Sequence, residues 1–424
     1  MARILLIAYA CDAEDVSETW CSHQWVRRFA QRHDATVLVY NRRRRRGAAP
    51  AQLPGARVIE WSEPALLERL GTFNDTVKPG YAHFYVCARR AIARLLRAER
   101  FDLVHQLEPF APRYPSPAAG LGLPLVLGPV GGAVATPDGF RDELGRSVPW
   151  HARLRAFDRA RFRFDPLLRH TYRSADVVLG VAPYVRELLG DVPLRRFEIL
   201  HETGVDALPP RTVRALPRHG RLSLLYVGRI TRAKGVRDAI RALADLADLP
   251  GIVLDVVGDG DDRATCEREA RERGVADRVR FHGWRPRDEV ARFYASADLF
   301  LFPSVREPSG TVVIEAMSHG LPLVVAANGG PAHVVDDSCG VRIPPVTPRQ
   351  YANAIAVALR TFALAPERLA PLGAAARRKV EEEFAWDTRI ERVGALYEDV
   401  IARSRSASAR RSHAASGVML PELP

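Results

Sequence analysis

The sequence lacks long apolar runs and is poor in cysteine. No run reaches the about 20 apolar residues that a membrane-spanning helix requires. The apolar segment 3–11 contains a single arginine and is followed at once by the acidic segment 12–15, so we expect a buried opening strand rather than an export leader. The five cysteines show no CxxC or metal-ligand spacing, which is typical of reduced thiols. We therefore expect a cytoplasmic protein.

Lysine is almost absent as well. Lys78, Lys234 and Lys379 are the only lysines, so nearly all of the 62 cationic side chains are arginines. Against 50 acidic side chains they give a formal net charge of +12. We attribute so strong a preference for arginine to codon composition more than to function. A lysine at a motif position is correspondingly informative.

The basic excess is concentrated in two places. Residues 42–46 form an unbroken run of five arginines. The segment 150–173 holds seven more, from Arg153 to Arg173. A solvated loop and a solvated helix face explain both clusters and are slightly favoured. The alternative is peripheral contact with the anionic inner face of a membrane, at about 1 kcal/mol per cation near the surface. No nucleic-acid partner is expected, because the chain has no recognisable binding motif and no basic strand with interleaved aromatic residues.

The 424 residues suffice for two domains, and they alternate between strand and helix patterns. Short apolar runs separated by helical patterns such as 19–31 and 81–99 predict parallel sheets covered on both faces. The proline-rich stretch 207–220 is typical of a linker. From Arg403 the chain has no periodic apolar face, which predicts a disordered tail. The predicted strands are 4–9, 36–40, 57–61, 103–105, 125–127, 177–180 and 198–200, followed by 222–228, 252–258, 279–282, 299–303 and 321–326.

Ligands of open parallel sheets bind beyond the carboxyl ends of the strands, so the loop 228–235 is the first candidate. Gly228 allows a tight turn, and Arg229 and Lys234 can reach a diphosphate near the following helix N-terminus. A surface turn with two solvated cations is an equal alternative for this loop taken alone.

The next loop contains Gly258-Asp259-Gly260. It lacks the third glycine of a dinucleotide fingerprint, because position 263 is Arg. Asp259 and Asp261 have the spacing of a metal-binding pair, but a glycine turn whose acidic residues cap the next helix is the preferred interpretation. We expect no metal site.

The most specific pattern is Pro303–Gly320, which follows an apolar strand. Glu307 precedes a predicted helix, and Glu315 lies about one and a half turns inside it, on the order of 10 Å away. At that separation the two carboxylates can each bind one end of an extended ligand. The exposed amides of Ser309–Thr311 lie between the two carboxylates and can bind hydroxyl or phosphate oxygens.

These motifs resemble those of the retaining GT-B glycosyltransferases of the GT4 family, the glycosyl transferases group 1. The family's glutamate pair with seven intervening residues matches Glu307 and Glu315, and its Gly-Arg-x4-Lys-Gly loop matches 228–235. The resemblance covers residues 3–402 and is strongest over 222–335. It implies an α/β protein of two doubly wound, Rossmann-like parallel-sheet domains that face each other across a cleft. The expected parts are an acceptor-binding domain at 1–205, a linker at 206–220, a nucleotide-sugar donor domain at 221–385, a crossover helix at 386–402 that packs back on the first domain, and the tail at 403–424.

The resemblance also implies roles for matching residues. Arg229 and Lys234 would bind the donor diphosphate and support catalysis. Glu315 would bind the ribose hydroxyls. Glu307 would be catalytic and would face the donor sugar together with the adjoining backbone. The full expected donor set is Gly228, Arg229, Lys234, Trp284, Arg285, Glu307, Pro308, Ser309, Gly310, Thr311, Glu315, Gly131 and Gly132.

Two further segments resemble family elements. The loop 281–284 is similar to the base-binding segment, in which the backbone near Trp284 and Arg285 would hold the nucleobase. The turn ending in Gly131-Gly132 is similar to a segment that presents backbone amides across the cleft in a subgroup of these enzymes.

The chain also departs from the family pattern. Family members often have Phe-Gly where this chain has Ser309-Gly310, and the difference alters the sugar pocket. The usual active-site His corresponds to Leu107 here. His105 either substitutes for it as a catalytic residue or is a buried structural His, and both interpretations remain open.

The sequence therefore predicts a glycosyltransferase. It would move a hexose-type unit from a nucleotide diphosphate sugar to a glycan, lipid-linked or small-molecule acceptor, with retention of anomeric configuration and without a metal or other cofactor. One alternative is a GT-B sugar-nucleotide epimerase, which needs no acceptor. The other is a non-catalytic protein that binds sugar nucleotides or glycans, an interpretation that Leu107 keeps open.

Overall fold

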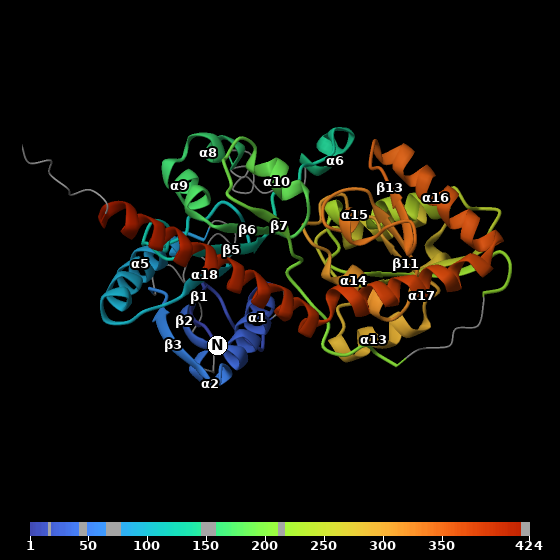
Figure 1. Cartoon of the computed structure of the whole chain (residues 1–424). Helices are drawn as coiled ribbons and strands as arrows, with labels where there is room; N and C mark the ends of the chain where they lie inside the picture. The colour runs from blue at the N-terminus through green and yellow to red at the C-terminus, as the bar shows by residue number, and fades with distance from the viewer. Residues whose placement is uncertain (16–17, 42–48, 65–77, 146–157, 211–216, 417–424) are drawn as a thin grey trace, which may run out of the picture.

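The structure is a computed structural model that describes residues 1–15, 18–41, 49–64, 78–145, 158–210 and 217–416. It contains two parallel sheets, each covered by helices, and Figure 1 shows them side by side with the last helix running back over the first. The sheets have seven strands in the order β3-β2-β1-β4-β5-β6-β7 and six strands in the order β10-β9-β8-β11-β12-β13. Both orders reverse beside the first strand of the sheet, as in doubly wound folds. The predicted fold class is confirmed.

The N-terminal sheet is buried on both faces, as alternate residues of its first strand demonstrate. Leu5 and Ile7 belong to the core under α5, α9 and α10, whereas Ile4 and Leu6 belong to the core under α1 and α18. The strands are β1 (Arg3–Ala8), β2 (Asp34–Asn41), β3 (Ala56–Ser62), β4 (Leu103–Glu108), β5 (Leu125–Val130), β6 (Val177–Gly180) and β7 (Phe197–Ile199). The helices are α1 (Glu18–Arg32), α2 (Ala49–Gln52), α5 (Gly80–Ala98), η1 (Asp138–Phe140), α6 (Arg141–Gly145), α8 (Asp158–Phe164), α9 (Pro166–Ser174) and α10 (Tyr184–Leu189).

The C-terminal sheet lies in a core of its own, formed largely from its apolar strands and the helices around them. Its strands are β8 (Arg221–Val227), β9 (Gly251–Val257), β10 (Val279–Gly283), β11 (Leu299–Phe302), β12 (Leu323–Ala326) and β13 (Gly340–Ile343). Its helices are η3 (Arg232–Lys234), α11 (Val236–Ala244), α12 (Arg263–Glu272), η4 (Ala276–Arg278), α13 (Arg287–Ser296), α14 (Thr311–Ser318), α15 (Pro331–Val334), α16 (Pro348–Leu364), η5 (Pro366–Arg368), α17 (Leu369–Lys379) and η6 (Val380–Phe384). Strand β13 was not predicted, because a four-residue strand with an arginine inside it carries little periodic signal.

The chain crosses between the halves twice at the same place. Val205 N–H donates to Phe384 O at 2.8 Å, and Trp386 N–H donates to Val205 O at 3.1 Å. From there α18 (Trp386–Ser416) returns across the N-terminal half, where Ile390 and Tyr397 are buried in its core.

Helix α18 is longer than expected. It continues to Ser416, so the predicted end at residue 402 and the predicted disorder of 403–416 are wrong; residues 417–424 lie outside the described part. Arg403 pairs with Asp399 one turn earlier at 2.9 Å, and Arg405 pairs with Asp102 of the N-terminal half at 2.7 Å. Alanine and arginine are strong helix formers, which extends an exposed helix without an apolar face.

Candidate active site

Glycines bring the carboxyl ends of three C-terminal strands together. Gly228 N–H donates to Val257 O at 3.0 Å, and Gly258 N–H donates to Gly283 O at 2.8 Å. Gly258 has φ 138°, and a Cβ atom there would lie 1.9 Å from Gly228 O. Only glycine permits both this conformation and this approach. The loops that follow β8, β9 and β10 are therefore neighbours, as the doubly wound topology requires.

Lys234 and Glu307 meet at this edge although 73 residues separate them. The Lys234 ammonium forms a short ion pair with the Glu307 carboxylate and lies 5.6 Å from the centre of the Phe302 ring. Gly235 allows the close packing, because a Cβ atom there would lie 2.0 Å from Pro303 O. The two motifs that the sequence singled out thus form one site. Lys234 is half-buried and Glu307 is buried, and an arriving anion can replace this carboxylate as the partner of the lysine.

Arg229 lies on the same loop as Lys234 and is exposed. Its carbonyl accepts a hydrogen bond from Tyr226 Oη at 2.9 Å, which fixes the backbone of the turn. In the described part of the chain its guanidinium forms no salt bridge. A flexible, uncompensated cation next to Lys234 can reach a diphosphate.

The loop 307–311 is held rigidly in front of α14. Glu307 O accepts from Gly330 N–H at 2.9 Å, and Asn328 Nδ2 donates to Val305 O at 2.7 Å. Gly310 is left-handed with φ 81° and begins α14. The first N–H groups of a helix have no partner inside it, so the N–H of Thr311, the first residue of α14, is available to bind an oxygen atom.

Glu315 lies on α14, on the side of α13. Its carboxylate accepts from Tyr294 Oη at 3.1 Å and pairs with Arg287 Nη2 at 3.2 Å. Burial raises the pKa of Glu315, and Arg287 opposes that shift. Arg287 also lies 4.7 Å from the ring centre of Trp20 on α1, so this carboxylate is linked to the N-terminal half.

The expected base-binding residues lie at the outer end of this edge. Trp284 is 73% exposed, and Arg285 is exposed and donates to His282 O at 3.1 Å. Arg287, two positions further on, was missed by sequence reasoning. Arg287 lies in a helix and is one of many arginines in the chain, so no sequence pattern distinguished it.

His105 does not belong to the site. It is fully buried in β4, where Nε2 donates to Gly128 O and Nδ1 accepts from Tyr397 Oη, each at 2.6 Å. Burial lowers its pKa to about 4. Both ring nitrogens are occupied and no face is open to a ligand, so the catalytic interpretation of His105 is wrong and the structural one describes it.

Gly131 and Gly132 also differ from expectation. Gly131 N–H donates to Phe110 O at 2.8 Å, and Gly132 N–H donates to Tyr184 Oη at 2.9 Å. Both amides therefore serve the N-terminal half itself. The interpretation that these two N–H groups are presented to a ligand is wrong for this conformation.

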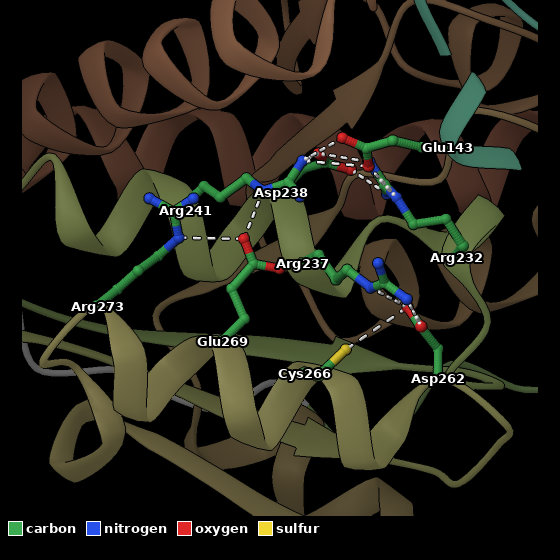
Figure 2. Close-up of polar contacts among 9 residues, drawn as sticks. All are labelled: Glu143, Arg232, Arg237, Asp238, Arg241, Asp262, Cys266, Glu269 and Arg273. Carbon is green, nitrogen blue, oxygen red and sulfur yellow. Dashed lines mark hydrogen bonds and ion pairs between the residues drawn. The ribbon is translucent and has the colours of Figure 1, made fainter. Parts of the chain in front are cut away.

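The segment that follows them reaches the C-terminal half instead. Asn328 Nδ2 donates to Ala135 O at 3.2 Å, and Phe140 and Leu144 are buried in the C-terminal core. Figure 2 shows that Glu143 of α6 and Asp238 of α11 both pair with the guanidinium of Arg232. Arg232 is 1% exposed and pairs with Asp238 at 2.7 Å and with Glu143 at 2.6 Å. This anchors the segment 135–145, and Figure 1 accordingly shows α6 between the halves.

The acidic turn after β9 is occupied by protein groups. Asp259 accepts from Gly260 N–H at 2.8 Å and pairs with Arg263 at 3.1 Å. Asp262 begins α12 without a side-chain cap, so the expected capping role is replaced by these contacts. In the described residues no three His, Cys, Asp or Glu side chains are grouped as a metal site would require.

The N-terminal half has a charged cluster that the sequence did not reveal. At the carboxyl ends of β1 and β4, Lys78 pairs with Glu108 at 3.0 Å and with Glu18 at 3.3 Å. Ala10 N–H donates to Glu108 at 2.8 Å. The rings of Tyr9 and Tyr114 lie within 6 Å of the ammonium, at 5.7 and 5.8 Å. Glu108 is buried, whereas the Glu18 side chain is 45% exposed, so Glu18 is the carboxylate of this cluster that a polyhydroxyl ligand can contact.

Two family models match the chain. "Glycosyl transferase 4-like domain" matches residues 19–201, and "Glycosyl transferases group 1" matches residues 213–378. Together they cover most of the sequence, and they divide it where the structure changes from one sheet to the other. No helix in the described part of the chain combines the length and hydropathy that crossing a membrane requires.

Named relatives match parts of the chain. Glycogen synthase of Mycobacterium tuberculosis (strain ATCC 25618 / H37Rv) is 35% identical over 187 residues, 44% of this chain and 44% of that protein. The GDP-mannose-dependent alpha-(1-6)-phosphatidylinositol monomannoside mannosyltransferase of Mycolicibacterium smegmatis is 31% identical over 248 residues, 54% of this chain and 64% of that protein. The matches thus span less than two thirds of these relatives.

Solved structures share the fold across the whole chain. Anabaena Alr3699/HepE in complex with UDP and glucose superposes with a TM-score of 0.62 at 18% identity, covering 94% of this chain and 100% of that one. Sucrose-phosphate synthase from Thermosynechococcus elongatus superposes with a TM-score of 0.66 at 21% identity, covering 95% and 100%. At such identities the likeness establishes the fold alone.

Proposed function

Because the chain belongs to the glycosyl transferases group 1 family, we propose that it transfers a hexose-type unit from a nucleotide diphosphate sugar to an acceptor held by the N-terminal half. The observation that carries this proposal is the contact between Lys234 and Glu307, which joins the two motifs at one strand edge. The exposed cation of Arg229 and the N–H of Thr311, the first residue of α14, would complete a site for a sugar attached to a diphosphate.

The proposed roles follow the order of groups along the edge. Arg229 and Lys234 bind the diphosphate. Once the phosphate has replaced Glu307 as the ion-pair partner of Lys234, the Glu307 carboxylate can bind the sugar hydroxyls. Glu315 binds the ribose hydroxyls, and the backbone near the exposed Trp284 holds the nucleobase at the far end of the ligand. The Anabaena structure contains UDP and glucose, and the Mycolicibacterium relative is GDP-mannose-dependent, which supports a nucleotide-sugar donor as the shared class.

The acceptor is proposed to be a sugar-containing or lipid-linked molecule at the Lys78–Glu108 cluster. That cluster lies at the carboxyl edge of the other sheet, the edge at which doubly wound domains bind ligands. The names of the relatives favour transfer over epimerisation or binding without turnover.

Incubation of the purified protein with a panel of nucleotide sugars tests the proposed function. We expect release of a nucleoside diphosphate from at least one donor, faster when a suitable acceptor is added. An isomerised sugar nucleotide would instead identify an epimerase. Binding without any chemical change would identify a non-catalytic protein.

We further expect activity that survives EDTA and a product that keeps the donor's anomeric configuration. Arg229 and Lys234 supply the positive charge that a metal would otherwise bring to the leaving diphosphate, whereas Asp259 is already paired with Arg263. In the proposed reaction the departing phosphate takes the acceptor's proton, so attack comes from the leaving-group face. An assay in EDTA, followed by NMR of the anomeric proton, measures both. Activity restored only by Mn²⁺ or Mg²⁺, or an inverted product, would contradict this prediction.

We also propose peripheral contact with an anionic membrane through the N-terminal half. At the junction of α8 and α9, Phe164 is 72% exposed and Leu167 is 42% exposed. The guanidinium of Arg163 lies 5.4 Å from the centre of the Phe164 ring. Apolar side chains beside arginines suit a surface of anionic head groups. The cluster 42–46 lies outside the described residues, as do Arg153 and Arg155 of the second cluster.

Sedimentation with liposomes tests this contact. We expect binding to phosphatidylserine-containing liposomes at low salt, weaker binding at high salt, and at least about tenfold weaker binding for Phe164→Ser/Leu167→Ser, since each buried CH₂ contributes about 0.8 kcal/mol. Leu364→Ser on the C-terminal half is the matched control, because Leu364 is also 42% exposed. Absence of binding at low salt would favour a solvated surface.

A further inference from the structure

The segment that follows β7 is fixed to the N-terminal half. Trp25 Nε1 on α1 donates to Glu202 O at 2.7 Å. The guanidinium of Arg389 on α18 makes a short hydrogen bond to His201 O. Since α1 and α18 both pack in the core of the N-terminal half, the backbone of residues 201–202 has little freedom.

From this fixed position both side chains reach Ser309 of the loop 307–311. Ser309 Oγ donates to Glu202 Oε1 at 2.5 Å. His201 Nε2 donates to Ser309 O at 3.1 Å, and His201 Nδ1 accepts from Thr203 N–H at 3.2 Å. Burial lowers the pKa of His201 to about 3, so the imidazole is neutral and this arrangement of donor and acceptor is the one available. Two consecutive residues of one half therefore hold the hydroxyl and the carbonyl of one serine in the other half.

This contact explains a departure of the sequence. The family often has Phe at the position of Ser309, and a Phe side chain has no hydroxyl to donate to a carboxylate. A serine at this position can donate its hydroxyl hydrogen to a carboxylate, and Glu202 accepts it here. Sequence reasoning did not single out Glu202, because 107 residues separate it from Ser309 and no local pattern marks it.

Charged and titratable groups surround Glu202 on several elements. Burial raises its pKa to about 7, the hydrogen bond from Ser309 lowers it, and the charges of Glu18 and Glu307 raise it. The groups that face it are Glu18 and Cys21 on α1, Tyr184 on α10, Ser309 and Glu307 on the loop 307–311, and Arg389 on α18.

We propose that Glu202 is a positioning residue for the donor-sugar loop 307–311, acting from the N-terminal half through the hydroxyl of Ser309. This inference rests on the proposed function, because it assumes that the loop faces the donor sugar. It adds that sugar binding depends on a contact between the two halves. If one half could form the donor-sugar site alone, sugar binding would not depend on this contact.

Kinetics of single and double variants test the proposed contact. Glu202→Ala and Ser309→Ala should each lower kcat/KM for the donor by about 10- to 100-fold, the range for a hydrogen bond to a charged group. The double variant should be no worse than the poorer single variant, because the two act through one hydrogen bond. Glu202→Gln should lose less activity than Glu202→Ala, since its amide oxygen still accepts from Ser309. Wild-type kinetics in Glu202→Ala, or effects of the two variants that multiply, would overturn the proposal.

The pH dependence distinguishes positioning from simple structural support. An ionised carboxylate accepts a stronger hydrogen bond than a neutral one, so wild-type kcat/KM should rise through an inflection near pH 7. Glu202→Gln should show no such inflection and should stay near the level of the acid limb. An inflection unchanged in Glu202→Gln would contradict the role of Glu202.

Hydrogen exchange provides a readout that does not need turnover. In the free protein, Glu202→Ala should speed amide exchange across the loop 307–311, and Glu202→Gln should not. Unchanged exchange in Glu202→Ala would overturn the inference even in a protein without activity. If wild type shows no turnover with any nucleotide sugar while the loop responds as described, the proposed function fails and the contact stands.

Discussion

Lys234→Ala should lower kcat/KM for the nucleotide sugar by about 100- to 1,000-fold, the cost of removing one oriented donor to a developing anion. The ammonium of Lys234 is half-buried against Glu307 and Phe302, so solvent cannot replace it easily. Removal also leaves the Glu307 carboxylate without its partner, and two negative groups, that carboxylate and the diphosphate, would then face each other. Steady-state release of nucleoside diphosphate measures the effect.

The chain offers a matched control for this variant. Lys379 is also half-buried and pairs with Asp336 at 2.5 Å, outside the loops of the proposed site. Lys379→Ala should keep kcat/KM within about threefold of wild type, whatever it does to stability. Arg229→Ala should resemble Lys234→Ala in kinetics while leaving the melting temperature unchanged, because Arg229 is exposed. Full activity in Lys234→Ala would refute the phosphate role.

Asp238→Ala should destabilise the protein by about 3–5 kcal/mol, because it removes the buried carboxylate that accepts two hydrogen bonds from the buried guanidinium of Arg232. The network in Figure 2 explains the size of the effect. Arg232 is 1% exposed and Asp238 is fully buried, so water cannot compensate either group. Glu143 remains as one partner, which keeps the effect below that of a fully isolated charge. Chemical denaturation gives the free energy of unfolding.

Asp248→Ala serves as the comparison. Asp248 pairs with Arg360 at 2.5 Å, but its side chain is 58% exposed. We expect a much smaller loss of stability there, because an exposed ion pair contributes little. Equal effects of the two variants would contradict the assignment of Arg232 and Asp238 as a buried anchor for the segment 135–145.

Strand pattern and turn chemistry predicted much of this molecule. All twelve expected strands correspond to strands of the two sheets, because fully buried parallel strands are short apolar runs. The loops at 228–235 and 303–320 were recognised from glycine and charge, and the structure places Lys234 against Glu307. Local sequence suffices where a motif is contiguous.

Contacts between distant segments were beyond the sequence. His105 was a candidate catalytic residue, yet its partners are Tyr397 and Gly128, which no spacing reveals. The amides of Gly131 and Gly132 find internal acceptors, again from remote residues. Glu202 and Arg287 matter through contacts across the two halves. In each case the role depends on the partner rather than on the residue type.

A crystal structure with a nucleoside diphosphate, chosen by a thermal-shift screen, tests the central claim most directly. The diphosphate should lie within hydrogen-bond distance of both Arg229 and Lys234, with the ribose hydroxyls on Glu315 and the terminal phosphate directed toward the loop 307–311. A nucleotide bound elsewhere, or one whose phosphates contact neither Arg229 nor Lys234, would contradict the site proposed for this chain.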